Sequence, residues 1–201
     1  MKARIAGERD LDGVTETLWL AFAEDPIWRW AFPEHEQLRA FWRLLVSSAL
    51  RYPWVWVMGD YAAASVWIPP HGTELTTDEE EQLEPLLDRL AGAHGHEILE
   101  LIERFEASHP QGEPHYYLSL LATHPGHRGK GLGMDLLSQN LARIDEEGAP
   151  AYLESTNPVN NRRYQGVGFG WRGEFRTPGE EHPIATMWRP GALRERVESA
   201  Q

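Results

Sequence analysis

The chain has 201 residues, 41% hydrophobic and 25% charged, a composition that suits a folded core and excludes a disordered chain. Its formal net charge of −12 disfavours binding to nucleic acid, which depends on Lys and Arg neutralising phosphates, and favours a cationic partner. The absence of cysteine excludes disulfides, thiolate metal ligands and a cysteine nucleophile.

Length and hydropathy predict where the chain resides and how it is organised. No apolar run approaches the ~20 residues that span a bilayer, and the first residues form no apolar signal core. We therefore expect a cytoplasmic protein with no membrane partner. No linker rich in serine or glycine divides the sequence, so we expect one domain over residues 1–201. The sequence leaves open a monomer or a homodimer.

The first part of the chain predicts a strand and two helices. Residues 2–6 alternate like a short strand, and Asp10 precedes apolar residues that recur at helical spacing over 11–22. The pair Asp25-Pro26 is typical of a turn, and the next amphipathic pattern predicts a helix over about 34–51.

The middle of the chain predicts a hairpin followed by acidic helices. Residues 54–58 and 62–68 are rich in strand-forming residues and are separated by the turn-forming pair Gly59-Asp60. Thr76 or Thr77 can cap an acidic helix start, because a hydroxyl accepts from unpaired helix amides. A further helix is expected over about 97–107.

The last third predicts a strand, glycine loop, helix and strand. Residues 115–123 read as a central strand, 132–144 as a helix and 151–155 as a strand. The crossover helix requires the two strands to be parallel. A short helix over 160–166 and strands over 169–176 and 184–188 complete a mixed sheet.

The loop before the predicted helix consists of Arg128, Gly129, Lys130, Gly131, Leu132 and Gly133. Its glycines let the backbone approach a ligand, and the first amides of the helix are unpaired donors. Arg128 offers a forked guanidinium and Lys130 a point charge, so the loop suits a diphosphate.

Three other interpretations of this loop were weighed. A Walker loop is rejected, because Gly131 stands where that motif needs Ser or Thr. A dinucleotide-binding fingerprint has support from Glu154 at the end of the next strand, but its glycines should directly follow the first strand. Glycines that serve only a turn would leave Arg128 and Lys130 unexplained.

Residues 120–133 resemble motif A of the GCN5-related N-acetyltransferases, with Arg128, Gly131 and Gly133 at the matching positions. Downstream, Asn157, Tyr164 and the pair Gly168-Phe169 are spaced similarly to the family's motif B. The similarity extends over most of the chain and is strongest to the puromycin-acetyltransferase-like members.

The resemblance implies an α/β (α+β) fold. We expect a mixed, mostly antiparallel sheet, with a parallel strand pair splayed around the acyl-CoA site and helices on both faces. Residues 1–114 would form the acceptor side, and residues 115–190 the acyl-CoA-binding core.

The resemblance also implies attack by an amine on the thioester of acetyl-CoA, or another short acyl-CoA, without a metal. Tyr164 is the expected general acid, since a phenol of pKa ~10 is protonated at neutral pH. Glu154, expected to be an exposed residue at a strand end, is a candidate base or a substrate-orienting group. The cofactor would contact Leu121, Ala122, Thr123, Arg128, Gly129, Lys130, Gly131, Leu132, Gly133, Asn157 and Asn160.

Aromatic faces beside a carboxylate suit an organic cation, so the expected acceptor-binding residues are Phe22, Asp25, Trp28, Trp30 and Trp67. Each of these tryptophans could instead be a core residue, and Asn157 and Asn160 could merely cap the following helix. His94 and His96 lie two positions apart and do not share a helix face, so no metal is assigned.

Three functions remain open at this point. The first is an enzyme that acetylates a small, cationic primary amine. The second is a protein or peptide N-acetyltransferase, and the third is a non-catalytic acyl-CoA sensor. The shape of the pocket and turnover distinguish them.

Overall fold

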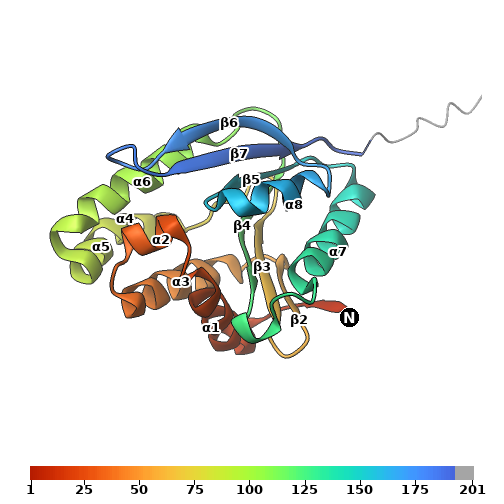
Figure 1. Ribbon diagram of the computed structural model, residues 1–201, viewed down its shortest axis with the longest axis horizontal. Helices are drawn as coiled ribbons and strands as arrows, with labels where there is room; N and C mark the ends of the chain where they lie inside the picture. Colours follow the sequence, from red (N-terminus) through yellow and green to blue (C-terminus); the bar gives the residue numbers. More distant parts are fainter. Residues whose placement is uncertain (193–201) are drawn as a thin grey trace, which may run out of the picture.

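The computed structural model describes residues 1–192 and contains one seven-stranded sheet with the order β1-β2-β3-β4-β5-β7-β6 (Figure 1). Strands β4 and β5 are parallel, and every other neighbouring pair is antiparallel. The expected mixed, mostly antiparallel sheet is confirmed. Residues 193–201 of the expected domain lie outside the described residues. The strands are β1 (Ala3–Ile5), β2 (Val55–Met58), β3 (Ala63–Ile68), β4 (Tyr116–Thr123), β5 (Ala151–Ser155), β6 (Gly170–Arg176) and β7 (Pro183–Arg189).

Helices cover both faces of the sheet (Figure 1). One buried cluster joins β2–β4 to α1, α3, α5 and α6, and the second packs α7 against the opposite face. Within residues 1–192, no helix has both the length and the apolar character needed to cross a bilayer. The helices are α1 (Leu11–Phe22), α2 (Pro26–Ala31), α3 (His35–Ala49), α4 (Thr77–Glu81), α5 (Leu83–Ala91), α6 (Gly95–Ser108), α7 (Leu132–Glu147) and α8 (Asn161–Gln165).

The predicted elements are confirmed with small shifts at their ends, and one helix was missed. Asp25 was expected to begin a turn, but its side chain accepts from the amides of Ile27 and Trp28 and caps α2, with Pro26 as the first helical residue. Thr76 caps α4 as expected, in a reciprocal capping box with Glu79.

A β-bulge in β4 decides which side chains face which helix layer. Val66 pairs with Leu120 and Trp67 with Leu118, so Ser119 is the extra residue. Because alternation shifts by one at the bulge, Tyr117 before it and Leu120 after it face the same layer, that of α1 and α3. The bulge thereby places the Tyr117 side chain on the same face of the sheet as Leu120.

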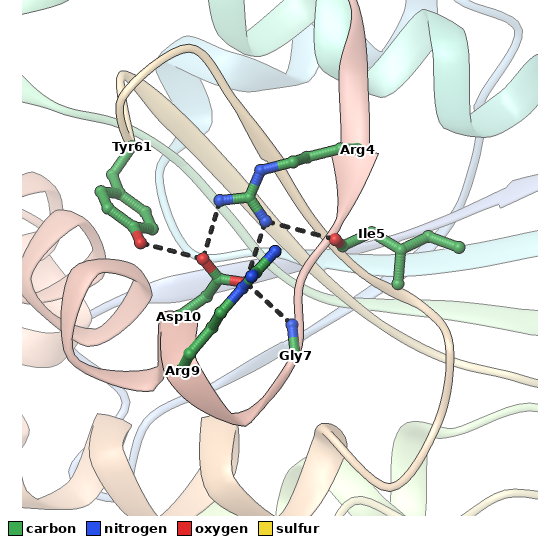
Figure 2. A network of polar contacts seen from close by, with 6 residues as sticks. All are labelled: Arg4, Ile5, Gly7, Arg9, Asp10 and Tyr61. Carbon is green, nitrogen blue, oxygen red and sulfur yellow. Dashed lines mark hydrogen bonds and ion pairs between the residues drawn. The ribbon is translucent and has the colours of Figure 1, made fainter.

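The start of the chain is fixed by a polar network around Asp10, which is 2% exposed (Figure 2). Arg4 donates to both carboxylate oxygens, at 2.7 and 2.9 Å. The Tyr61 hydroxyl and the Gly7 amide donate at 2.9 and 3.0 Å. The network joins β1, α1 and the β2–β3 turn, and the bound cation and donors lower the pKa of Asp10 well below its usual range.

We expect Asp10→Asn to lower the free energy of unfolding by about 2 kcal/mol, because it weakens the charge-assisted hydrogen bonds that the buried Asp10 side chain accepts from Arg4, Tyr61 and Gly7. A carboxyl whose pKa falls on folding stabilises the fold above its unfolded pKa of ~4 and loses this effect as the pH falls. The difference between the variant and the wild type should therefore shrink below about pH 4. Urea unfolding of both proteins measures it. Asp12→Asn, at an exposed carboxylate, is the control and should change stability by less than about 0.5 kcal/mol.

Candidate active site

The candidate site begins where β4 and β5 separate. These strands pair at only three positions, Tyr116–Leu118 with Ala151–Leu153. Beyond the bulge, the His124 amide donates to the Ala62 carbonyl at 3.0 Å. Since hydrogen-bonded pairs alternate in antiparallel strands, the amides of Leu121 and Thr123 point away from β3, toward the gap. The gap is therefore lined by backbone donors that β5 does not pair.

The glycine loop leads from this gap into α7. Gly129 and Gly131 have φ of 79° and 76°, a left-handed conformation that favours glycine. Gly131 caps α7, and the first bond of that helix runs from the Asp135 amide to the Gly131 carbonyl. The amides of residues 132–134 thus precede the bonded part of the helix. A Cβ on Gly133 would lie 2.5 Å from the Thr123 hydroxyl, so only glycine fits there.

The loop fits the pyrophosphate of an acyl-CoA. Arg128 and Lys130 are exposed, and within residues 1–192 neither contacts a carboxylate. Arg128 instead donates to the Ala21 carbonyl at 2.8 Å, which ties the loop to α1. Two cationic side chains that are not paired with carboxylates, beside a helix N-terminus, attract a phosphate group. Three other residues expected to bind the cofactor lie between β4 and the start of α7. Leu121 lines the cleft, Ala122 is 3% exposed within the sheet, and Leu132 is the first residue of α7.

A cleft of about 550 Å³ continues from the gap between β4 and β5 toward α2, α5 and α6. This volume suits a small-molecule site. One wall is aromatic and centres on Trp28, whose ring lies 4.6 Å from Trp42, 5.9 Å from Phe41 and 6.2 Å from Phe105. Residues from β4, β5 and the segment after β5 also line the cleft.

Glu154, on β5, lies in this cleft but is not the exposed strand-end residue that the sequence predicted. Its side chain is 2% exposed, and within residues 1–192 neither carboxyl oxygen accepts a hydrogen bond of normal geometry, although the hydroxyl groups of Tyr152 and Tyr117 lie near it. Burial raises its pKa to about 8, a rise that the hydroxyl groups of Tyr152 and Tyr117 limit. A carboxyl group with this pKa can accept a proton near neutral pH.

Further carboxyl groups line the cleft beyond Glu154. Glu74 accepts from the Ser119 hydroxyl at the bulge, and burial raises its pKa. Glu106 on α6 has a raised pKa through burial and through the charges of Glu80 and Glu103. The charge of Glu74 also raises the pKa of Glu154. Glu74, Glu106 and Glu154 thus all line the cleft, and Glu106 is exposed to solvent.

Tyr164, on α8, lines the cleft and packs at 6.2 Å from Phe169. Burial raises its pKa to about 12, and the nearby Asp25 charge adds to the rise. The phenol is therefore protonated over the whole range in which Glu154 titrates. A base and an acid with widely separated pKa values thus line one cleft.

Asp25, Asn157 and Asn160 also line the cleft, and each has a partner within the protein. Asp25 caps α2 and accepts from the Thr156 hydroxyl at 2.8 Å, which joins the acceptor side to the segment after β5. Asn157 accepts from the Val159 amide at 3.2 Å, and Asn160 accepts from Arg163 at 2.9 Å. The structure thus shows local structural roles for these side chains, and their expected roles in binding stay predictions.

Of the other expected acceptor-binding residues, Phe22 and Trp28 line the cleft, whereas Trp30 and Trp67 do not. Trp67 is 0% exposed, lies on the α7 face and donates to Asn140 at 3.0 Å. Trp30 contacts His94, whose Nε2 lies 3.0 Å from the Trp30 carbonyl. The structure therefore does not bring these two tryptophans to the cleft.

The sequence pattern missed several groups that line the cleft, namely Glu74, Glu106, His109 and His115. They lie in loops or on a helix far from the glycine motif, and no motif marks them. Within residues 1–192, no three or more histidine and carboxylate side chains are arranged to hold a metal ion.

Comparison with known proteins places this geometry in a family. The model of the acetyltransferase (GNAT) family matches residues 20–169. One similar structure is described as histone acetyltransferase HPA2 and related acetyltransferase, from Corynebacterium glutamicum. It has 24% identity and a TM-score of 0.72, and the match covers 96% of this chain and 98% of that one. The polyamine N-acetyltransferase of Drosophila melanogaster has 18% identity and a TM-score of 0.67, covering 94% and 99%. Arylalkylamine N-acetyltransferase 2 of Aedes aegypti has 16% identity and a TM-score of 0.67, covering 94% and 98%. The chain belongs to the GNAT family of acetyltransferases, and it is an acyltransferase of a family whose co-substrate is acetyl-CoA.

Proposed function

We propose that this enzyme transfers the acetyl group of acetyl-CoA to the primary amine of a small cationic molecule, by direct attack in a ternary complex. The observation that carries the proposal is Glu154, a buried carboxyl group with a pKa raised to about 8 that lines a cleft of about 550 Å³. Residues 1–114 would supply the acceptor side of one catalytic domain, and residues 115–190 the acyl-CoA side.

When bound, acetyl-CoA supplies an activated acyl group. Arg128, Lys130 and the first amides of α7 would hold its pyrophosphate, and the amides of Leu121 and Thr123 would lie along its pantetheine arm. One of these amides can stabilise negative charge on the acyl oxygen, an effect worth ~3 kcal/mol for one donor.

Glu154 would take a proton from the substrate ammonium and leave a nucleophilic amine. Its pKa of about 8 keeps a large fraction ionised at mildly alkaline pH. Tyr164, protonated throughout this range, would donate a hydrogen bond to the departing sulfur. The two groups would thereby act at opposite ends of the transfer.

Two further carboxyl groups in the lining of the cleft suggest that the acceptor carries a second positive charge. Glu74 and Glu106 line the cleft together with Glu154 and several aromatic residues. Carboxylates and aromatic faces both attract organic cations. Similar structures are described as a polyamine and an agmatine N-acetyltransferase, which supports a diamine or an alkylamine that carries a guanidinium group as the acceptor.

We expect diamines to be acetylated with a kcat/KM at least about tenfold above that of monoamines of equal length. Glu106→Gln should remove much of this preference by raising the KM for the diamine, while leaving monoamines unchanged. Release of the CoA thiol measures both rates. Glu84→Gln, at an exposed glutamate on α5 outside the cleft lining, is the control, and equal rates for mono- and diamines would contradict the second charge.

The same panel should include puromycin and short peptides. Likeness to puromycin-acetyltransferase-type members predicts that the aromatic wall accepts an aromatic amine. Turnover with peptides alone would favour a protein acetyltransferase, and tight binding of acetyl-CoA without any turnover would favour a sensor. The cleft volume of about 550 Å³ supports a small-molecule acceptor.

A further inference from the structure

Two histidines, His109 and His115, are hydrogen-bonded to each other, and His109 lies beside the candidate base Glu154. We propose that His109 is a proton-relay residue, which takes the proton from Glu154 after each transfer and releases it to solvent. This inference rests on the proposed function. His109 follows α6, and together with His115 and Glu154 it lines the cleft.

The hydrogen bonds assign a tautomer to each ring. A carbonyl oxygen only accepts, so His115 Nδ1 must donate to the Glu113 carbonyl, 2.7 Å away. In a neutral ring His115 Nε2 is then an acceptor, and the 2.9 Å contact makes His109 Nε2 its donor. Neutral His109 consequently keeps an unprotonated Nδ1, and this atom lies 4.0 Å from Glu154 Oε1.

Glu154 must release the proton that it takes from the substrate before the next turnover. Its side chain is 2% exposed, whereas that of His109 is 30% exposed, so a proton on Glu154 has little contact with water once substrate fills the cleft. His109 reaches both the carboxyl group and solvent. The 4.0 Å separation exceeds a direct hydrogen bond, and one bridging water or an approach of about 1 Å would complete it.

The other titratable groups beside the pair do not offer this route. The pKa values of Tyr117 and Tyr152 are raised above their usual range, mainly by burial, so both hydroxyls hold their protons. Glu74 is a second carboxyl group with a raised pKa. Arg172 is a permanent cation, and its charge helps to lower the pKa of His109.

The relay balances as two proton transfers. The O–H bond of Glu154 breaks as an N–H bond forms at His109 Nδ1, and the imidazolium then loses a proton to water. Burial, His115 and Arg172 lower the pKa of His109 to about 4, so the cation is short-lived and the ring returns to its neutral form.

The uphill step is compatible with catalysis. The pKa values of about 8 and about 4 make the first transfer unfavourable by about 10⁴. From a limit of ~6 × 10¹² s⁻¹, this penalty alone leaves an upper limit of about 6 × 10⁸ s⁻¹, so the difference in pKa does not prevent turnover at a typical ~10 s⁻¹. Edge-to-face contacts with Tyr117 and Tyr152, at 4.9 and 5.0 Å, hold the ring in position.

Variants of His109 test the relay by kinetics. His109→Phe keeps the aromatic contacts but removes both nitrogens, and we expect kcat to fall about 10²-fold with the KM for the amine nearly unchanged. In His109→Ala, added imidazole should restore turnover. His96→Ala, an exposed histidine on α6, is the control. An unchanged kcat in His109→Phe, or a loss that imidazole does not rescue, would overturn the relay.

Nitrogen-15 NMR of labelled histidine provides a readout that does not depend on turnover. The relay predicts that His109 is neutral at pH ~7 with its proton on Nε2. A proton on Nδ1, or a charged ring at this pH, would overturn it. If only the relay is wrong, the wild type still releases thiol with an amine substrate. If the wild type shows no turnover with any amine, both the proposed function and the relay are contradicted.

Discussion

Glu154→Gln is expected to lower kcat on the order of 10³-fold, the largest effect of any substitution in the cleft. Glutamine keeps the shape of the side chain but cannot take a proton from the substrate ammonium. The affinity for acetyl-CoA should change little, because the glycine loop and α7 lie at the other end of the site. Thiol release gives the first quantity, and calorimetric titration with CoA the second.

The pH profile of the wild type identifies the same group. Because Glu154 must be ionised to act, kcat should rise with pH and level off above about pH 8. Glu154→Gln should lack this rise. Glu146→Gln, at an exposed glutamate on α7, is the control and should retain both the rate and the profile. A profile in Glu154→Gln like that of the wild type would assign the base elsewhere.

Stability should change in the opposite direction to activity. The pKa of Glu154 is raised on folding, so the folded state holds its proton more tightly than the unfolded state above pH ~4.3. Stability is therefore lost as the pH rises toward about 8, by up to about 1.4 kcal/mol for each unit between the two pKa values. A higher Tm for Glu154→Gln than for the wild type at alkaline pH is the expected result.

Tyr164→Phe is expected to lower kcat about 10²-fold. Phenylalanine keeps the packing against Phe169 but removes the only donor of the side chain, so the departing sulfur loses its hydrogen bond. The KM for the amine should stay within about threefold, and thiol release at saturating substrates measures the change. Because the pKa of Tyr164 is raised to about 12, its ionisation should not change kcat below about pH 10.

Tyr116→Phe is the matched control for this substitution. Tyr116 donates to Glu147 at 2.7 Å on the α7 face and does not line the cleft. Its removal should leave kcat within about threefold. If the two tyrosine variants behave alike, the hydroxyl of Tyr164 takes no part in the transfer.

The sequence predicts the part of the site that depends on backbone geometry. The glycine spacing, the apolar strand before it and the periodic helix after it are local patterns, so the β4–α7–β5 unit could be placed correctly. Gly133 shows why the motif is strict, since Thr123 leaves no room for a Cβ. The crossover rule then gave the parallel pairing of β4 and β5.

The sequence could not predict features that depend on distant packing. Glu154 is 2% exposed and has His109, which is distant in the sequence, 4.0 Å from its carboxyl group, and no local pattern reveals this burial. Trp67 alternates with its neighbours like any strand residue, and only the order of the strands decides that it faces α7. The helix α2 was missed because Asp25-Pro26 is compatible with both a turn and a helix start.

The central claim is direct acetyl transfer to an amine in the cleft, and parallel quantification of CoA thiol and acetylated amine tests it most directly. The purified enzyme is incubated with acetyl-CoA and the best diamine of the panel. The account predicts equal amounts of the two products, both lost in Glu154→Gln. Thiol release without acetylated amine, or binding of acetyl-CoA without either product, would contradict it.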